Sequence, residues 1–174
     1  DRSINIKLQE LKEGLKLETD IDFIESYDIS HHAGKNAVAG CVVYSTKGKT
    51  QDLYRSYNIS KTNWGNDTGS MTELIKRRFS KIDSKQLPSL VIIDGGKTHL
   101  RHALRAFRDC NISDINVISI SKGARRKATF DSIHLPNGKN ITIDQGSAFH
   151  HFVQEIRDET HRYAITIQKK KMRK

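Results

Sequence analysis

The segment Leu90-Val-Ile-Ile-Asp-Gly-Gly-Lys97 decides the fold. Its first four residues form a short apolar run, which is typical of a strand buried on both faces, as parallel strands are. Two glycines and a helical pattern over residues 98–107 follow, so we expect a strand, a tight turn and a helix. In open α/β sheets, ligand sites lie outside the carboxyl ends of the strands, and Asp94 stands at such an end. The segment therefore predicts an α/β fold with an acidic side chain at a site-forming edge.

The sequence on either side of this segment extends the pattern. Apolar residues recur with a helical period near the N-terminus, and three strand candidates joined by short turns follow, as in an antiparallel meander. After the central segment come another apolar strand, a polar stretch with a hairpin turn, and a last helix. The expected elements are helices over 4–17, 71–79, 98–107 and 147–167, strands over 22–29, 37–44, 52–59, 90–94 and 115–120, and a turn at 136–139.

This element order predicts the architecture and the number of domains. A meander followed by strand–helix–strand crossovers gives a mixed five-stranded sheet, with an antiparallel meander plus parallel strands, flanked by helices. It is the element order of the ribonuclease H-like fold. No repeat or flexible linker divides the 174 residues, so we expect one domain over 1–174, with a leading helix within 1–20. The basic segment 169–174 is expected as a disordered tail or as the start of a linker to a further module.

Charge and composition narrow the class of partner. The chain has 30 Lys and Arg against 20 Asp and Glu, a formal net charge of +10. Such an excess favours polyanionic partners through phosphate contacts, although a solvated basic surface without specific meaning would give the same number. From charge and position alone, we expect phosphate contacts from Lys97, Arg55, Lys122, Arg125 and Arg126.

Neither a membrane protein nor a disulfide scaffold is indicated. No apolar run approaches the ~18 residues that a bilayer span requires, and the first residues lack the apolar region of a signal peptide. The two cysteines, Cys41 and Cys110, have no zinc-like spacing, and Cys41 lies in an apolar run where we expect a small buried residue. We therefore expect a cytoplasmic protein with no membrane association and no small-molecule cofactor.

Two carboxylates are candidates for a metal site. Asp28 ends the first predicted strand, where it is either a ligand or a cap or turn former, and Asp94 is either a ligand or the N-cap of the next helix. Two carboxylates on neighbouring central strands repel each other unless a cation lies between them. A hard divalent ion, Mg²⁺ or Mn²⁺, resolves this repulsion, lowers the pKa of a water and stabilises the charge of phosphoryl transfer. The pair thus predicts metal-dependent phosphodiester chemistry.

Two further residues are candidates with an open alternative. His161 lies on the last predicted helix, roughly a third of a turn from the centre of its apolar stripe. It is either a metal ligand or proton carrier, or an exposed histidine paired with Asp158. Asp67 is either catalytic or the N-cap of a helix that starts near Gly69. The other seven histidines show no zinc-like spacing with cysteine and are assigned no metal.

Three motifs in this order resemble the C-terminal nuclease half of the UvrC family, the endonuclease subunit of bacterial nucleotide excision repair. They are Asp28-Ile-Ser-His31, Ile93-Asp-Gly-Gly-Lys97 and Arg157-Asp-Glu-Thr-His-Arg-Tyr-Ala-Ile165, and the likeness runs along nearly the whole chain. The resemblance implies a ribonuclease H-like fold and a metal site of Asp28, Asp94 and His161, with a further important acid at Asp67.

The resemblance also implies an activity and partners. It implies DNA repair within the SOS response, by incision 5′ to a lesion in damaged double-stranded DNA. UvrB is the expected partner, with UvrA acting upstream. Departures from the family pattern, such as Lys35 and Ser56, spare the three expected ligands and bear on substrate contacts only. The family's Gly-Ile-Tyr and helix-hairpin-helix modules are absent from the sequence, so we expect it to be part of a longer protein.

Two alternatives to this nuclease remain open from the sequence. One is a nucleic-acid-binding domain of the same fold that does not cut, in which Asp28 and Asp94 are only structural caps. The other is a Holliday-junction-type or RNA-directed nuclease of the same fold.

Overall fold

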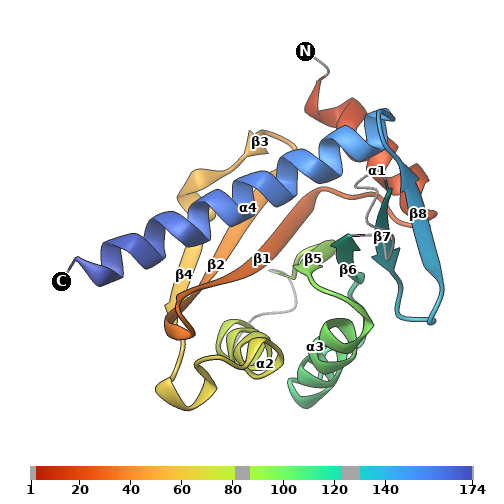
Figure 1. The fold of residues 1–174 in the computed structure, drawn as a ribbon. Helices are drawn as coiled ribbons and strands as arrows, with labels where there is room; N and C mark the ends of the chain where they lie inside the picture. The colour runs from red at the N-terminus through yellow and green to blue at the C-terminus, as the bar shows by residue number, and fades with distance from the viewer. Residues whose placement is uncertain (1–2, 81–86, 123–129, 174) are drawn as a thin grey trace.

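The computed structural model describes residues 3–80, 87–122 and 130–173, which form one sheet covered by helices on both faces (Figure 1). The strands are β1 Phe23–His32, β2 Lys35–Ser45, β3 Gly48–Lys49, β4 Arg55–Asn58, β5 Leu90–Asp94, β6 Val117–Lys122, β7 Phe130–His134 and β8 Asn140–Asp144. The helices are α1 Ile4–Leu15, α2 Asp67–Phe79, α3 Lys97–Asp109 and α4 Ala148–Met172, with short 3₁₀ turns η1 Gln51–Leu53 and η2 Lys61–Asn63. Within these ranges, no helix has both the length and the apolar composition that crossing a membrane requires.

The sheet is mixed, as the element order predicts. Its order is β3-β2-β1-β5-β6-β7-β8, with β4 paired to β2. The strands β1, β5 and β6 run parallel, whereas the pairs β1–β2, β6–β7 and β7–β8 are antiparallel. The expected count of five strands is wrong, because the sheet formed by the described residues has eight. The hairpin β7–β8, whose turn follows Leu135 as expected, hydrogen-bonds to β6 and so extends the sheet, and β3 adds a two-residue strand.

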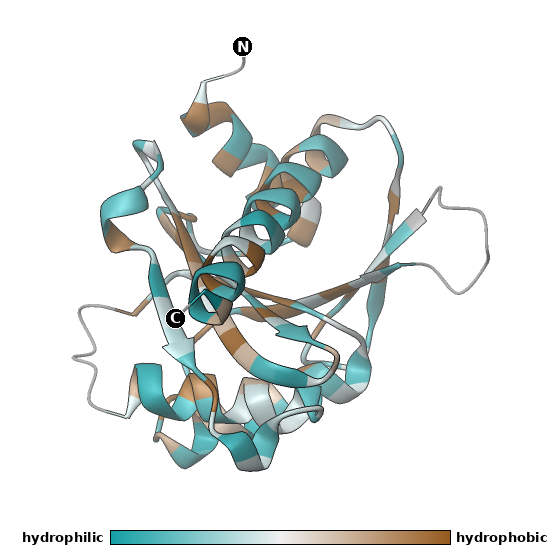
Figure 2. Ribbon diagram, turned by 60° about the vertical axis from the view of Figure 1, so that its left-hand side comes forward, coloured by the Kyte–Doolittle hydropathy of each residue, from teal (hydrophilic) through white to brown (hydrophobic). Residues whose placement is uncertain are grey.

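Alternation along the strands separates two apolar cores. Hydrophobic residues are concentrated along the central strands, between the helices (Figure 2). In β5, Val91 and Ile93 face the core beneath α2 and α3, whereas Leu90 and Ile92 face the core beneath α1 and α4. All four are buried, which confirms the prediction that this strand is covered on both faces. Cys41 is also fully buried, as expected.

Two helix ends differ from the predictions by more than two residues. The helix α2 begins at Asp67, four residues earlier than expected, because the side chain of Asn66 accepts a hydrogen bond from Gly69 N at 2.9 Å and caps it. The helix α4 continues to Met172, so the basic segment is not a disordered tail as far as residue 172. Gln168 extends its buried face, and the lysines of the last turn oppose the negative end of the helix dipole.

A buried ion pair joins α2 to the central strand β1. Glu25 is fully buried and accepts hydrogen bonds from Arg78 Nη2 at 2.7 Å and Arg78 Nε at 3.1 Å. The Tyr27 hydroxyl and the Cys41 thiol also donate to Glu25, at 2.7 and 3.4 Å. Burial, followed by the charge of Glu25, raises the pKa of Tyr27 well above its ordinary value, so its hydroxyl keeps the proton that it donates.

Gly40 allows α4 to lie close to the sheet. It sits on β2 opposite Asp28, and a Cβ built there would lie 3.0 Å from both Cα and Cβ of Ala164 on α4. Tyr163 Cδ2 would be 3.1 Å away. Because the nearest of these atoms are backbone and Cβ, the helix can relieve the contact only by moving.

We therefore expect Gly40→Ala to lower the free energy of unfolding by about 1–3 kcal/mol, the usual cost of overpacking. The measurement is urea denaturation of the wild-type and variant chains. An unchanged midpoint and slope would mean that α4 does not depend on this close contact.

Candidate active site

The parallel pairing of β1 and β5 brings Asp28 and Asp94 together. The ladder runs from Ile24 opposite Leu90 to Tyr27 opposite Ile93, so the two aspartates are the next residues on the two strands. Asp94 also pairs with Ile120 of β6. Both carboxylates therefore stand at the carboxyl edge of the parallel part of the sheet, where ligand sites form.

The local alternatives for these two residues do not hold. Asp94 is not the N-cap of α3, because that position is Gly96. Asp28 does not end its strand as predicted, since β1 continues to His32 through its antiparallel pairing with β2. Inside the strand it has no capping role, and its Oδ1 accepts a hydrogen bond from Ile29 N at 2.9 Å.

The helix α4 places His161 against Asp28. A hydrogen bond of 2.9 Å joins His161 Nδ1 to Asp28 Oδ2, and the imidazole is 68% exposed whereas the carboxylate is 12% exposed. One residue earlier, Thr160 donates to Ser26 of β1 at 2.9 Å, which fixes the helix on the strand. The alternative pairing of His161 with Asp158 is not seen, because the partner of His161 is Asp28.

The environment of Asp28 suits a nearby cation. Burial raises the pKa of Asp28 above its ordinary value, the charge of Asp94 raises it further, and the hydrogen bond from His161 partly offsets both. Two ionised carboxylates in this position repel each other, and hard oxygen donors of this kind fit Mg²⁺ or Mn²⁺. In the described part of the chain, no three His, Cys, Asp or Glu side chains are gathered closely enough to hold a metal. The donor set that fits an ion is thus the carboxylate pair, with His161 bonded to one member.

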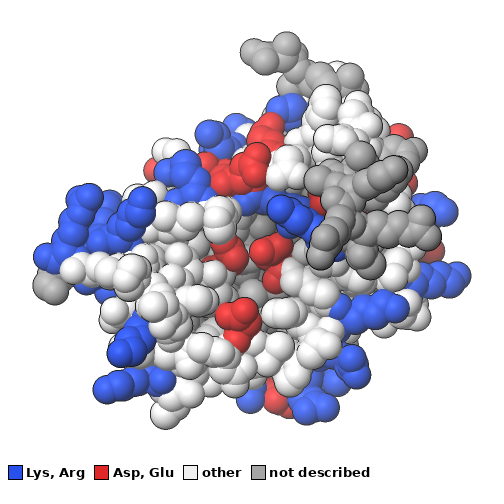
Figure 3. Space-filling view, viewed as in Figure 1, with Lys and Arg blue, Asp and Glu red and all other residues white. Residues whose placement is uncertain are grey.

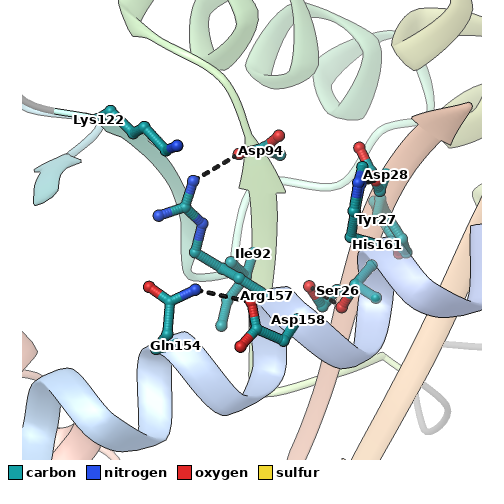
Figure 4. Close-up of a pocket in the computed structure, with 11 residues that line it drawn as sticks. Ser26, Tyr27, Asp28, Ile92, Asp94, Lys122, Gln154, Arg157, Asp158 and His161 are labelled. Carbon is teal, nitrogen blue, oxygen red and sulfur yellow. Dashed lines mark hydrogen bonds and ion pairs between the residues drawn. The ribbon is translucent and has the colours of Figure 1, made fainter. Parts of the chain in front are cut away.

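Two adjoining hollows meet at this pair. The first has a volume of about 310 Å³, lies between the strand ends and α4, and includes His161 and Lys122 (Figure 4). The second, of about 250 Å³, shares Asp28 and Asp94 and adds Asp67 from the first turn of α2. In the space-filling view, acidic side chains gather at the hollowed centre of this face and basic ones surround it (Figure 3).

Asp67 belongs to this site by position. The alternative that it caps α2 does not hold, because Asn66 is the cap and Asp67 is the first helical residue. Asn66, Asp67 and Thr68 are all types that cap helices, so the sequence alone does not choose among them. Exposed and facing the second hollow, Asp67 adds a third carboxylate near the pair.

The expected phosphate contacts differ in their position relative to the carboxylate pair. Lys122 lines the first hollow, and Lys97 is exposed at the start of α3, next to the turn that follows Asp94. Arg55 lies on β4 and lines a different hollow that does not include the carboxylates. The predicted contacts Arg125 and Arg126 fall outside the described residues.

Arg157 was not predicted as a site residue. It lies one helical turn before His161 on α4, and its Nη2 is 3.2 Å from Asp94 Oδ1. The spacing of four residues from His161 puts both side chains on one face of the helix, and this is the signal that could have found it.

Glu159 fixes α4 from its other side. It accepts a hydrogen bond from the Tyr54 hydroxyl at 2.6 Å and two from Arg162, at 2.8 and 3.0 Å. The Arg162 hydrogen bond lowers the pKa of Glu159 below its ordinary value of 4.5, and the Tyr54 hydroxyl adds to this against the effect of burial. The charged form of Glu159 therefore stabilises the fold.

Because the pKa of Glu159 is lowered, its contribution to the stability of the fold should depend on pH. A lowered pKa in the folded state contributes stability above the unfolded pKa, and that contribution is lost as pH falls through the folded pKa. We expect Glu159→Gln to lower the free energy of unfolding by about 1 kcal/mol at pH 7, a modest cost because Arg162 is half exposed. Denaturation at pH 7 and pH 3 should show the difference shrinking at the lower pH. A difference independent of pH would contradict the role of the Glu159 charge.

The chain is similar to known proteins in sequence and, to a lesser degree, in fold. The family described as the UvrC RNase H endonuclease domain matches residues 12–165. UvrABC system protein C of Legionella pneumophila (strain Paris) is 38% identical over 99% of this chain, and that of Serratia proteamaculans is 39% identical over 94%. In both cases the chain spans 28% of the relative's length.

Solved structures with a lower likeness include two of endonuclease V. The catalytic domain of human endonuclease V has a TM-score of 0.44 at 12% identity, covering 80% of this chain and 69% of that one. A Ciona intestinalis endonuclease V bound to inosine-containing DNA has a TM-score of 0.41 at 16% identity, covering 68% and 56%. Neither likeness is high enough to add to the family match. On that match, which covers most of the sequence, the chain belongs to the UvrC RNase H endonuclease domain family.

Proposed function

We propose that this chain is a divalent-metal-dependent DNA endonuclease domain that makes the 5′ incision beside a lesion in nucleotide excision repair. The observation that carries the proposal is the pair Asp28 and Asp94, side by side at the end of the β1–β5 ladder and at the meeting point of two hollows. Membership of the UvrC endonuclease domain family supports the reaction class.

Each residue of the site has a role in the proposal. Asp28 and Asp94 hold Mg²⁺ or Mn²⁺, which when bound would lower the pKa of a water and stabilise the charge that develops on the phosphate. His161 is held by Asp28 in one orientation, as a histidine that ligates or moves a proton must be. Asp67 adds negative charge across the second hollow.

Substrate contacts come from the surrounding cations. Without a bound metal ion, the acidic residues at the centre of this face would repel phosphates. The Lys and Arg residues around them attract phosphates (Figure 3). Of the expected phosphate contacts in the described residues, Lys122 lines the first hollow and Lys97 begins α3 beside the turn that follows Asp94. Arg55, Arg125 and Arg126 remain further candidates. The proposed substrate is damaged double-stranded DNA, with UvrB as partner and UvrA upstream, because the similar proteins are named as component C of the UvrABC system.

The test is a nicking assay of the full-length protein with UvrA and UvrB on a duplex that carries one lesion. We expect a 5′ nick in Mg²⁺ or Mn²⁺ and none after chelation, with activity returning when either ion is restored. Nicking that survives chelation would overturn the metal dependence. DNA binding with no nick under any ion would favour the domain that binds without cutting, and preferential cutting of an RNA–DNA hybrid would favour an RNA-directed nuclease.

A further inference from the structure

Arg157 lies at the wall of the first hollow, where it contacts Asp94 (Figure 4). A second carboxylate, Asp131, lies against the other end of its guanidinium. Arg157 Nη2 lies 3.2 Å from Asp94 Oδ1, and its Nη1 lies 3.2 Å from Asp131 Oδ2 on β7. The guanidinium is 16% exposed and Asp131 is 12% exposed, whereas Asp94 is 50% exposed. The Nη1 end of the guanidinium therefore faces the largely buried Asp131, and the Nη2 end faces the half-exposed Asp94.

Arg157 and His161 contact the carboxylate pair from one side of the site. Each lies on the same face of α4, and each is bonded to one member of the carboxylate pair, His161 to Asp28 and Arg157 to Asp94. Arg157 is therefore the cation that neutralises Asp94 when no metal ion does so. A divalent ion bound by Asp94 would compete with the guanidinium for the same carboxylate, and the two positive charges would repel each other.

Asp131 can keep the guanidinium in place when it leaves Asp94. Its buried Oδ2 accepts no hydrogen bond from the described residues, although Arg157 Nη1 is 3.2 Å away and His150 Nε2 is 3.6 Å away. This oxygen thus has unused capacity for a hydrogen bond beside the guanidinium. A small rotation of Arg157 toward Asp131 would make that hydrogen bond and free Asp94.

We propose that Arg157 is the resident counter-ion of the metal site: it holds Asp94 while no metal is bound, and a divalent cation displaces it toward Asp131. The inference rests on the proposed function, because it takes Asp28 and Asp94 to be the metal-binding pair. It makes Arg157 a positioning residue whose effect is seen in metal affinity without DNA or turnover.

The test is calorimetric titration of Mn²⁺ into the 174-residue chain without DNA. Arg157→Gln should tighten Mn²⁺ binding by roughly two- to fivefold, the range expected when a partly exposed ion pair no longer competes. Lys122→Gln is the matched control, because Lys122 lines the same hollow and has no ion pair with Asp28 or Asp94 in the described structure. It should change the affinity much less.

Asp131→Asn gives the opposite prediction. Without that carboxylate, Arg157 should stay on Asp94, so Mn²⁺ should bind more weakly, and this effect should disappear in the Arg157→Gln background. Thermal denaturation checks that each variant folds, and if Arg157→Gln does not, Arg157→Lys should give an affinity between those of the wild type and the neutral variant.

Three patterns of Mn²⁺ affinity decide whether the counter-ion role and the proposed metal site hold. Unchanged or weaker Mn²⁺ binding by Arg157→Gln, or equal tightening by Lys122→Gln, would overturn the counter-ion role while leaving the metal site intact. If the wild-type chain and all variants bind no Mn²⁺, both the counter-ion role and the proposed metal site fail. Tightening by Arg157→Gln alone, with the effect of Asp131→Asn confined to the wild-type background, supports the inference.

Discussion

Asp94→Asn is expected to lower the rate of 5′ incision by about a thousandfold or more, while DNA binding is kept. The amide is nearly the same size as the carboxylate, but it removes one of two negative charges that would hold the ion. A metal that polarises the reacting groups supplies several kcal/mol of transition-state stabilisation, and about 4 kcal/mol corresponds to a thousandfold in rate. The surrounding cations are untouched, so the affinity for DNA should remain.

The measurement is the incision rate of the full-length protein on a lesion-bearing duplex, together with DNA binding by fluorescence anisotropy. Asp114→Asn is a matched control, because Asp114 is exposed and precedes β6, at the opposite edge of the sheet from Asp94. It should cut at the wild-type rate. If Asp94→Asn also cuts at that rate, the carboxylate pair is not the catalytic centre.

Arg78→Met is expected to lower the free energy of unfolding by about 3–5 kcal/mol, the largest effect on stability among the changes considered. The substitution leaves Glu25 fully buried with no opposing charge, and only the Tyr27 hydroxyl and the Cys41 thiol remain as partners. Removing one member of a buried ion pair costs this much because the other charge stays desolvated. For a chain of this size, the melting temperature should fall by about 10 °C.

Arg77→Met is the control for this prediction. Arg77 precedes Arg78 on α2, but its side chain is 45% exposed and its ion pair with Glu73 lies at the surface, so we expect a cost of at most about 1 kcal/mol. The double variant Glu25→Gln with Arg78→Met should recover part of the loss, since no buried charge is left. Equal costs for Arg77→Met and Arg78→Met would contradict the account of the buried pair.

The parts of the site that the sequence predicts are those set by local pattern. Asp94 follows a continuous apolar run and precedes two glycines, and this pattern alone places it at a strand end. Asp28 is harder to place, because its strand is extended by hairpin pairing beyond the point where the parallel ladder stops. The sequence identifies Asp28 as a candidate, but only the register of β1 against β5 shows that Asp94 is its neighbour.

The parts that the sequence misses depend on long-range packing. Arg157 acquires its role only when α4 lies across the sheet and the hairpin β7–β8 brings Asp131 to its side. That hairpin was expected as a separate element, and its pairing with β6 adds two strands to the expected five, while β3 adds a third. The capping alternative for Asp67 lies one residue from the true cap, Asn66, because neighbouring Asn, Asp and Thr carry the same local signal.

The most direct test of the proposed metal site is anomalous diffraction from crystals soaked in Mn²⁺. The proposal predicts an Mn²⁺ peak within about 2.5 Å of carboxylate oxygens from both Asp28 and Asp94, with the Arg157 guanidinium turned toward Asp131. A soaked crystal in which Mn²⁺ binds only elsewhere, or in which Arg157 still holds Asp94 and no peak lies between the two aspartates, would contradict it.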